Sequence, residues 1–361
     1  MNPNKEKVTL EHLRDEIDAV DNQMLELLNQ RMEVVRKVGA LKKKHNTVIY
    51  RPEREKSIID RLAKANKGLL NRSAIEAIFL EVFAISRNLE LPEKVAFLGP
   101  HCSFTHQAAE SRFGAMGEYL PLSQIKKVFE AVDTDRARFG VVPMENNQEG
   151  PVNETIDLLG DFDLSIVAEI AMPIHFAFAS NHDSVSEIRK IYSRDIAFRQ
   201  CKHFIEEYFE DDIELVPVSS TAKAVRLARK ESHAGALCPK IAAKEYRMPI
   251  LFENVEDSED NFTRFLILGK GFVNQPSGSD KTTILARLSG DTGSLAKFLV
   301  DFSSEGINLT KIESRPAKKG KNFKYRFLIS FDGHFSEANV QRVLKKYGKR
   351  VKLLGSYVKL C

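Results

Sequence analysis

The segment LRDEIDAVDNQMLELLNQRMEVVRKVGALKKK (13–44) contains no proline and a single glycine, Gly39. Its apolar residues recur at alternating spacings of four and three, beginning with Leu13, Ile17, Val20, Met24 and Leu27. This spacing is typical of one long amphipathic helix with a continuous apolar seam. The segment therefore predicts an all-helical N-terminal domain built around this helix.

Two shorter helices are predicted after the long one. The first has Pro52 in its opening turn, where proline is tolerated, and ends near Asn66. The second runs from about Ala74 to Glu90, with Asn71 or Ser73 as its cap. Two short helices cannot cover the whole seam of the first, so we predict a homodimer or higher homo-oligomer with interlocked helices.

Polar residues interrupt the apolar pattern of this helical segment. Arg31 stands where the seam, continued from Leu27, expects an apolar side chain. Lys42 follows after nearly three full turns and projects from almost the same face. A buried cation is costly unless it is paired, so Arg31 predicts an anion bound between the helices. Taken singly, each such residue is better explained by a surface salt bridge.

The pattern changes from Val95 onward. Short apolar runs that are typical of strands alternate with helical stretches such as HQAAESRFG (106–114). The runs are VAFLG (95–99), FGVVP (139–143), LSIVAEI (164–170) and HFAFAS (175–180). This alternation predicts an α/β domain with a largely parallel sheet, ending near Gly271.

A third segment follows QPSGSD (275–280), a linker by composition. Its predicted order is strand, helix, strand, strand, helix, strand within about 80 residues. That order is typical of a ferredoxin-like sandwich, an α+β fold that implies no function by itself.

Three polar segments lie at the ends of apolar runs in the middle domain, where open α/β sheets bind ligands. A buried loop rich in Asn, Thr and Arg needs hydrogen-bond partners, which a bound polyanion could supply. Loop capping and Asx-turns are the alternative explanation. The segments are GPHCSFTHQAA (99–109), PMENNQEGPVNETID (143–157) and EDNFTRF (259–265).

Composition excludes several classes of protein. The net charge is +4, and the basic residues beyond position 277 are scattered without a nucleic-acid-binding motif. No apolar run approaches the roughly 20 residues that a membrane span needs. The four cysteines are far apart and lack the spacing of metal ligands. This argues against a disulfide framework and for a reducing compartment, so we expect a cytoplasmic protein without a metal. The cysteines are Cys102, Cys201, Cys238 and Cys361.

The N-terminal segment resembles the all-helical chorismate mutase family. The resemblance covers the first 90 or so residues and rests on motifs in three different predicted helices. The motifs are LRDEID (13–18), LNQRMEVVRKVGALK (28–42), YRPERE (50–55) and FLEVFAISRNLE (79–90).

This resemblance implies a site for chorismate and a role for each matching residue. Arg14, reaching across a dimer, would join Arg31 and Arg54 in gripping the two carboxylates. Lys42 would bind the ether oxygen, and Glu55 would hold the hydroxyl. The rearrangement needs no nucleophile, metal or cofactor, because holding a compact conformer and stabilising charge on the ether oxygen suffice.

Ser86 and Glu90 complete the implied mutase site. Some relatives carry an amide where Glu90 stands, and an ionised carboxylate cannot donate a hydrogen bond to an ether oxygen. We therefore predict that mutase activity falls as rising pH ionises Glu90. Arg51 stands where some members have aspartate, and we assign it no role.

Residues from about 95 to 270 resemble prephenate dehydratase, most specifically in NFTRF (261–265). The resemblance implies that Thr263 delivers a proton to the departing ring hydroxyl, while Arg264 steers or binds a carboxylate. Asn146 and Gln200 match further pocket positions. Ser103 and Thr105 match positions that contact the substrate.

Two residues depart from the usual dehydratase pattern. Cys102 replaces a glycine, and Asn147 replaces a serine or threonine. A side chain at position 102 is unfavourable only if the backbone there needs a positive φ.

The segments TGSLAKFL (292–299) and NLTKIESRP (308–316) resemble ACT regulatory domains, which bind phenylalanine between paired domains. A simple oligomerisation domain is the alternative. The implied effector site comprises Gly293, Ser294, Leu295, Asn308, Glu313, Ser314 and Arg315.

Together these features predict a multidomain enzyme of phenylalanine biosynthesis. An all-α three-helix chorismate mutase domain (1–92) precedes an α/β two-subdomain prephenate dehydratase domain (94–271) and a ferredoxin-like ACT domain (281–361). Chorismate and prephenate are the expected substrates and phenylalanine the expected inhibitor, without a cofactor. Alternatives are a chain with one active domain, with the mutase favoured, or a phenylalanine-sensing protein; arogenate could also replace prephenate.

Overall fold

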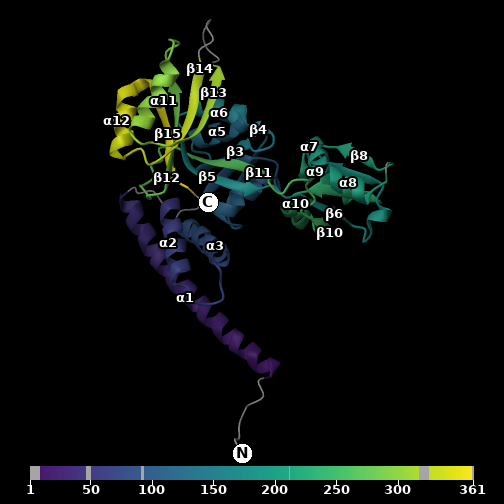
Figure 1. Cartoon of the computed structure of the whole chain (residues 1–361). Helices are drawn as coiled ribbons and strands as arrows, with labels where there is room; N and C mark the ends of the chain where they lie inside the picture. Colours follow the sequence, from purple (N-terminus) through teal and green to yellow (C-terminus); the bar gives the residue numbers. More distant parts are fainter. Residues whose placement is uncertain (1–8, 46–49, 91–92, 211, 317–324, 360–361) are drawn as a thin grey trace, which may run out of the picture.

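The computed structural model describes residues 9–45, 50–90, 93–210, 212–316 and 325–359. Three parts follow one another along the chain: N-terminal helices, a two-lobed middle part and a C-terminal sheet with helices (Figure 1). Residues 1–8 and 91–92, which the predicted N-terminal domain includes, lie outside the described residues, as does Cys361.

The N-terminal part consists of three helices, as predicted: α1 (Leu10–His45), α2 (Pro52–Ala65) and α3 (Arg72–Glu90). Asn71 is the residue that caps α3, because its Oδ1 accepts from the Ala74 N–H at 2.8 Å. Gly39 lets α1 and α3 approach closely, since a Cβ there would lie 3.3 Å from Glu90 Cα.

The N-terminal half of α1 extends past α2 and α3 (Figure 1). Its apolar seam is exposed, with Ile17 at 58% and Leu27 at 63%. Such a contiguous apolar stripe is typical of a surface that another chain covers. The predicted oligomer would bury it.

The first lobe of the middle part is a mixed sheet in the order β2-β1-β3-β11-β5, with the short β4 paired to β3. Helices α4, α5 and α6 belong to this lobe. The bounds are β1 (Lys94–Leu98), α4 (Phe104–Phe113), β2 (Glu118–Leu122), α5 (Ile125–Asp133), β3 (Phe139–Asn146), β4 (Gly150–Pro151), α6 (Asn153–Asp161), β5 (Ser165–Pro173) and β11 (Phe262–Gly269).

The second lobe is a five-stranded sheet in the order β10-β6-β9-β7-β8. Figure 1 shows it beside the first lobe, joined to it through the ends of β5 and β11. The bounds are β6 (Ala177–Ser180), η1 (Val185–Glu187), β7 (Lys190–Ser193), α7 (Asp195–Gln200), α8 (Lys202–Tyr208), β8 (Glu214–Pro217), α9 (Thr221–Ala228), β9 (Ala234–Cys238), α10 (Lys240–Glu245) and β10 (Ile250–Glu253).

The prediction of a largely parallel sheet was wrong. In the first lobe β1 runs parallel to β2 and β3, but β11 is antiparallel to both of its neighbours, β3 and β5. The second lobe is likewise mixed, because β6 pairs antiparallel with β9 and β10. The reason is the chain path: β5 leaves for the second lobe and β11 returns from it, so the two run in opposite directions.

The C-terminal part has the predicted order of elements. Its antiparallel sheet, β13-β14-β12-β15, carries two helices and packs against the first lobe through β15 and β5. The bounds are β12 (Asp280–Arg287), α11 (Ser294–Ser304), β13 (Leu309–Pro316), β14 (Tyr325–Asp332), α12 (Ala338–Tyr347), η2 (Gly348–Arg350) and β15 (Val351–Val358).

None of the helices in the described part of the chain combines the length and the apolar composition that a membrane span requires.

Two candidate active sites

The three N-terminal helices enclose a cavity of about 610 Å³. It brings together six of the seven residues predicted for the mutase site, although they come from three helices. The six are Arg31, Lys42, Arg54, Glu55, Ser86 and Glu90.

Two polar contacts join α1 to α3 within this cavity. Arg31 Nη1 donates to Ser86 Oγ at 2.5 Å, and Lys42 Nζ lies 2.8 Å from Glu90 Oε2. The Arg31 guanidinium also lies 5.7 Å from the centre of the Phe83 ring. Burial lowers the pKa of Arg31, while Glu55 and Glu90 act in the opposite direction. The predicted convergence of Arg31 and Lys42 on one face is thus observed.

The charges around the cavity favour an anionic ligand. Five cations line it against two carboxylates, Glu55 and Glu90. The low dielectric of a partly enclosed site strengthens the attraction for a dianion. The cations are Arg31, Lys42, Arg51, Arg54 and Arg87.

Arg14 lies apart from the other predicted mutase residues. It is exposed on α1 and does not line the cavity of its own chain. It can reach such a cavity only from a second copy of the chain.

Arg87 is a member of this site that the sequence did not reveal. It is 4% exposed, pairs with Glu55 and donates to the backbone carbonyl of Arg112 in the first lobe. Its guanidinium lies 5.0 Å from the centre of the Tyr50 ring. Burial raises the pKa of Glu55, and Arg87 opposes that rise. The only sequence signal was its place beside Ser86 on α3.

A second cavity, of about 440 Å³, is a cleft lined by residues of both lobes of the middle part. Five of the six dehydratase residues predicted as catalytic or substrate-binding line it. They are Ser103, Thr105, Asn146, Gln200 and Thr263.

Asn146 and Thr263 form the centre of this cleft. They are directly paired in the register of β3 and β11, and Asn146 Nδ2 donates to Thr263 Oγ1 at 2.9 Å. Asn146 Oδ1 accepts from the backbone N–H groups of Gln148 and Glu149, which fixes the orientation of the amide. Because Thr263 Oγ1 accepts this bond, its hydroxyl hydrogen is free to point to a ligand.

Gln200 joins the same polar chain from the second lobe. Asn261 donates from Nδ2 to Gln200 Oε1 at 3.2 Å and accepts at Oδ1 from Asn146 Nδ2 at 2.8 Å. Asn261 is only 1% exposed, so these bonds satisfy an amide that would be costly to bury alone.

The loop that ends at Ser103, just before Thr105 in the first turn of α4, contains a strained residue. Cys102 has a φ of 62°, in the left-handed region that favours glycine. Because φ is positive at position 102, a side chain there is unfavourable. Ser103 Oγ accepts from the His106 N–H at 3.3 Å and caps α4.

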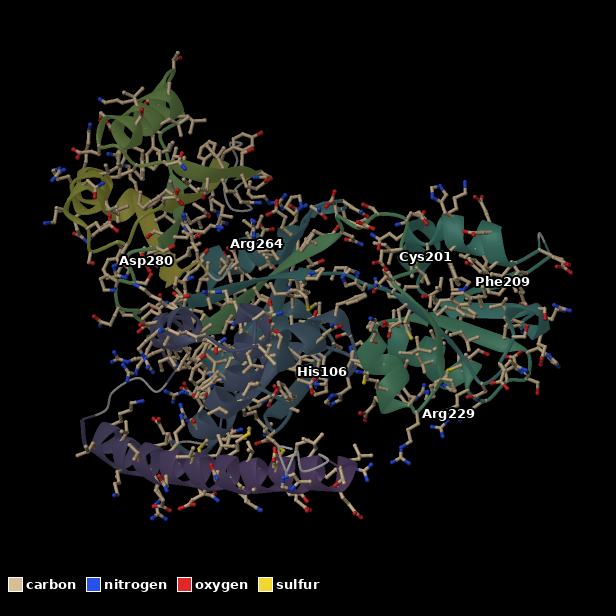
Figure 2. The ribbon with its side chains drawn as sticks, turned by 60° about the horizontal axis from the view of Figure 1, so that its bottom comes forward. His106, Cys201, Phe209, Arg229, Arg264 and Asp280 are labelled. Carbon is tan, nitrogen blue, oxygen red and sulfur yellow. The ribbon has the colours of Figure 1, made fainter. Side chains whose placement is uncertain are left out.

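Arg264 lies outside the cleft, contrary to its predicted role there. Neighbouring residues of a strand point to opposite faces, so Arg264 faces away from Thr263. It pairs instead with Glu145 at 3.0 Å and with Glu169 at 2.7 Å. Figure 2 labels it in the first lobe, with Asp280 of the C-terminal part on one side and Cys201 of the second lobe on the other.

Four polar cleft residues lie outside the segments that the sequence singled out: Arg194, Ser219, Ser220 and Thr221. They follow β7 and β8, two neighbouring parallel strands of the second lobe. Polar residues at the ends of two strand-like runs were the signal that could have revealed them.

The predicted effector residues lie along two elements of the C-terminal part. Gly293, with a φ of 80°, precedes α11 and leads into Ser294 and Leu295. Asn308 precedes β13, which carries Glu313, Ser314 and Arg315. Arg315 turns toward the first lobe, where it lies 3.4 Å from Asp157 Oδ2.

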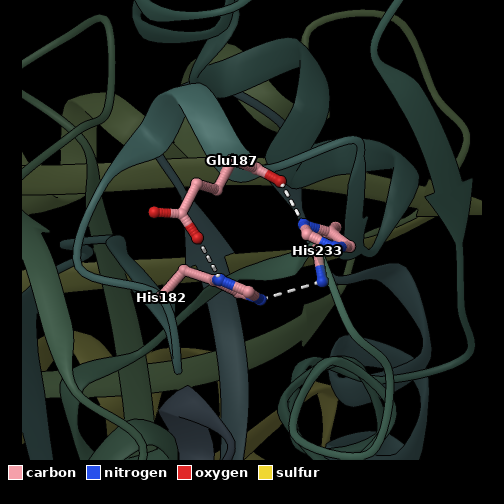
Figure 3. Close-up of side chains that lie close together, drawn as sticks. All are labelled: His182, Glu187 and His233. Carbon is pink, nitrogen blue, oxygen red and sulfur yellow. Dashed lines mark hydrogen bonds and ion pairs between the residues drawn. The ribbon is translucent and has the colours of Figure 1, made fainter.

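One cluster of possible metal ligands lies in the second lobe, away from the cleft: His182, Glu187 and His233 (Figure 3). Its groups already bond one another. His182 Nδ1 lies 2.8 Å from Glu187 Oε2, and His182 Nε2 accepts from the His233 N–H at 2.9 Å. His233 Nδ1 bonds the Glu187 backbone oxygen at 2.8 Å. These bonds hold two adjoining turns together, which accounts for the cluster.

Comparison with known families agrees with this division of the chain. The chorismate mutase type II family matches residues 13–91, and the prephenate dehydratase family matches residues 95–272. A prephenate dehydratase from Arthrobacter aurescens, solved in complex with L-Phe, is 30% identical with a TM-score of 0.67. That alignment covers 74% of this chain and 90% of the other. The fold and the two sites thus define an enzyme that joins a mutase to a dehydratase.

Relatives with the same combination span the whole chain. The bifunctional chorismate mutase/prephenate dehydratase of Aquifex aeolicus is 42% identical over 97% of this chain and 98% of its own length. That of Pseudomonas aeruginosa is 37% identical over the same shares. The chain belongs to the family of bifunctional chorismate mutase/prephenate dehydratases and is an enzyme of phenylalanine biosynthesis.

Proposed function

We propose that the helical cavity converts chorismate to prephenate and that the two-lobed cleft converts prephenate to phenylpyruvate. The observation that supports this best is the separation of two chemically different pockets. One is rich in cations, and the other is centred on the Asn146–Thr263 hydrogen bond. The domain bounds proposed for these activities are 1–92 and 94–271.

In the cavity, Arg31 and Arg54 would hold the carboxylates of chorismate, with Arg14 supplied by a second copy of the chain. Lys42 would stabilise the negative charge that develops on the ether oxygen as its bond to carbon breaks. The Arg54 guanidinium makes no hydrogen bond or ion pair with any described residue, so it is available to a ligand. Ser86 fixes Arg31, and Glu55 would accept from the substrate hydroxyl.

In the cleft, the Thr263 hydroxyl would donate to the ring hydroxyl of prephenate. A threonine hydroxyl is a weak acid, so it orients or relays the proton rather than supplying it alone. As the hydroxyl leaves as water, the bond from the ring to its carboxylate breaks, and its electron pair completes the aromatic ring. Prephenate and one proton thus give phenylpyruvate, CO2 and water.

The C-terminal part (281–361) would be a ferredoxin-like ACT domain that binds phenylalanine and inhibits the enzyme. The strand and helix order and the open backbone at Gly293 support this proposal, because free N–H groups at a helix start can donate hydrogen bonds to a carboxylate. The exposed seam of α1 supports a homodimer or a larger homo-oligomer. A biosynthetic enzyme with these small, polar substrates would act in the cytoplasm.

Separate assays on chorismate and on prephenate test both activities, with and without phenylalanine. We expect Arg31→Ala to lower mutase activity and Thr263→Val to lower dehydratase activity, each by roughly 100-fold and each without effect on the other reaction. If the wild-type chain catalysed only one of the two reactions, it would be an enzyme with a single active domain. Phenylalanine binding without either turnover would indicate a sensor instead.

A further inference from the structure

The dehydratase cleft has an unusual charge balance for a site that binds a dianion. Of the described side chains that line it, Arg194 alone is cationic, and Glu149 is negative. Arg264, the arginine expected from the sequence to bind a carboxylate, lies on the opposite face of β11 and is paired there with two glutamates. Arg194 is therefore the candidate for carboxylate recognition.

The position of Arg194 follows from the topology of the second lobe. It comes directly after β7, whose last residue, Ser193, pairs with Pro217 at the end of β8. The Val218 N–H donates to the Ser193 carbonyl at 2.7 Å, so the two loops stay together beyond the strands. Arg194 thus shares one wall of the cleft with Ser219 and Ser220.

The guanidinium of Arg194 is exposed and makes no hydrogen bond or ion pair with any residue that the structure describes. Arg189 on the same lobe differs, because its guanidinium donates to the Ser186 carbonyl at 2.9 Å. An arginine without a protein partner can offer a ligand carboxylate two parallel N–H donors.

Arg194 and Gln200 lie at opposite ends of α7, and both line the cleft that holds Thr263. Gln200 ends α7 and is linked through Asn261 and Asn146 to Thr263. Arg194 precedes the same helix, roughly 9 Å away along its axis at 1.5 Å per residue. When the ring hydroxyl of prephenate meets Thr263, the three-carbon side chain at the opposite ring position extends toward Arg194.

The chemistry decides which of the two carboxylates Arg194 should hold. The ring carboxylate becomes CO2 and gives its electrons to the ring, so a cation on it would stabilise the substrate more than the transition state. The side-chain carboxylate keeps its charge throughout. We propose that Arg194 binds the side-chain carboxylate of prephenate, an inference that rests on the dehydratase assignment above.

Steady-state kinetics of Arg194→Gln and Arg194→Lys in the full chain test this proposal. We expect Arg194→Gln to raise the KM for prephenate roughly 10- to 100-fold with a smaller change in kcat, as for loss of a charged hydrogen bond. The Arg194→Lys variant should keep part of the affinity, because lysine keeps the charge but lacks the two parallel N–H donors of a guanidinium. Arg229→Gln, an exposed arginine of the same lobe (Figure 2), is the matched control. Mutase activity reports that each variant is folded.

Product inhibition by phenylpyruvate, which keeps only the side-chain carboxylate, identifies the bound group. The proposal expects the inhibition constant for phenylpyruvate to rise with the KM for prephenate. A raised KM with an unchanged constant would overturn the assignment in favour of the ring carboxylate. An unchanged KM in Arg194→Gln would overturn any binding role. If the wild-type chain did not turn over prephenate, the proposed dehydratase function would be wrong. Calorimetry of phenylpyruvate binding to the wild type and to Arg194→Gln would still test the role of Arg194.

Discussion

Lys311 of the C-terminal part lies with its Nζ 2.6 Å from Glu145 Oε2, beside the cleft residue Asn146. Glu145 and Asn146 are neighbours on β3, just as Arg264 and Thr263 are neighbours on the paired β11. Asn146 and Thr263 face the cleft, whereas Glu145 and Arg264 face the C-terminal part. The same two strands therefore connect the cleft to the domain proposed to bind phenylalanine.

Lys311→Met should weaken inhibition of the dehydratase by phenylalanine. The ion pair to Glu145 links β13 directly to the strand that carries Asn146, and only 14% of the Lys311 side chain is exposed. We expect roughly 2- to 30-fold more phenylalanine to be needed for half inhibition. Lys345→Met, an exposed lysine of α12, is the control, and an unchanged inhibition curve in Lys311→Met would contradict this connection.

Arg87→Met should lower mutase activity by at least about 10-fold, because it leaves the buried Glu55 carboxylate without its partner. Arg87→Lys should keep part of the activity, although it cannot serve Glu55 and the Arg112 carbonyl together. The ratio of mutase to dehydratase activity is the measurement. Arg61→Met, on the exposed side of α2, serves for comparison, and equal ratios in both variants would refute the role of Arg87.

Glu90→Gln should change the pH profile of the mutase. In the wild type, Glu90 Oε2 lies 2.8 Å from Lys42 Nζ, and only a protonated carboxyl could donate a hydrogen bond to the ether oxygen. The glutamine amide can donate at every pH, so the variant should lose the decline in kcat/KM expected of the wild type as pH rises. Dehydratase activity of the same sample corrects for general effects of pH. Two superimposable mutase profiles would rule the hypothesis out.

Glu93→Gln should stabilise the protein above neutral pH. Burial raises the pKa of Glu93 to about 7, against the opposing effect of Arg87 and Arg138. A raised pKa means that the folded state favours the protonated form. The free energy of unfolding should therefore fall as pH rises from about 4.5 to 7 and stay level above that range. The Glu93→Gln variant should not show this decline, so urea unfolding at pH 8 should find it roughly 1–3 kcal/mol more stable than the wild type. The same dependence of stability on pH in the variant and the wild type would disprove the prediction.

Cys102→Gly should be more stable than Cys102→Ala. Both variants lose the packing of a thiol that is 2% exposed, but only glycine relieves the left-handed backbone at a φ of 62°. We expect a difference of about 1 kcal/mol in the free energy of unfolding. An alanine variant as stable as the glycine variant would show that the backbone at this position carries no strain.

Periodicity predicted part of the helical site, and the resemblance to the chorismate mutase family implied Arg54 and Glu55. The face that a helical residue occupies follows from its sequence spacing, so Arg31 and Lys42 could be placed together before α2 and α3 were positioned. The partner of Arg87 could not be predicted this way. Its contacts to Glu55 and to the Arg112 carbonyl depend on how the helices dock on the first lobe.

In the cleft, too, some features follow from the local sequence and others from contacts between residues that are distant in sequence. Strand alternation already implied that Thr263 and Arg264 face opposite sides of β11. Only the docking of the second lobe and of the C-terminal part decided which side became the cleft, since residues far away in sequence supply both walls. Sequence alone determined the order of the elements and the helix faces, because these depend on short-range spacing, and the family resemblance implied most of the predicted site residues that line the two cavities. Tertiary structure decided the direction of β11, the place of Arg264 and the exposure of Arg194 to the cleft, because each depends on long-range contacts.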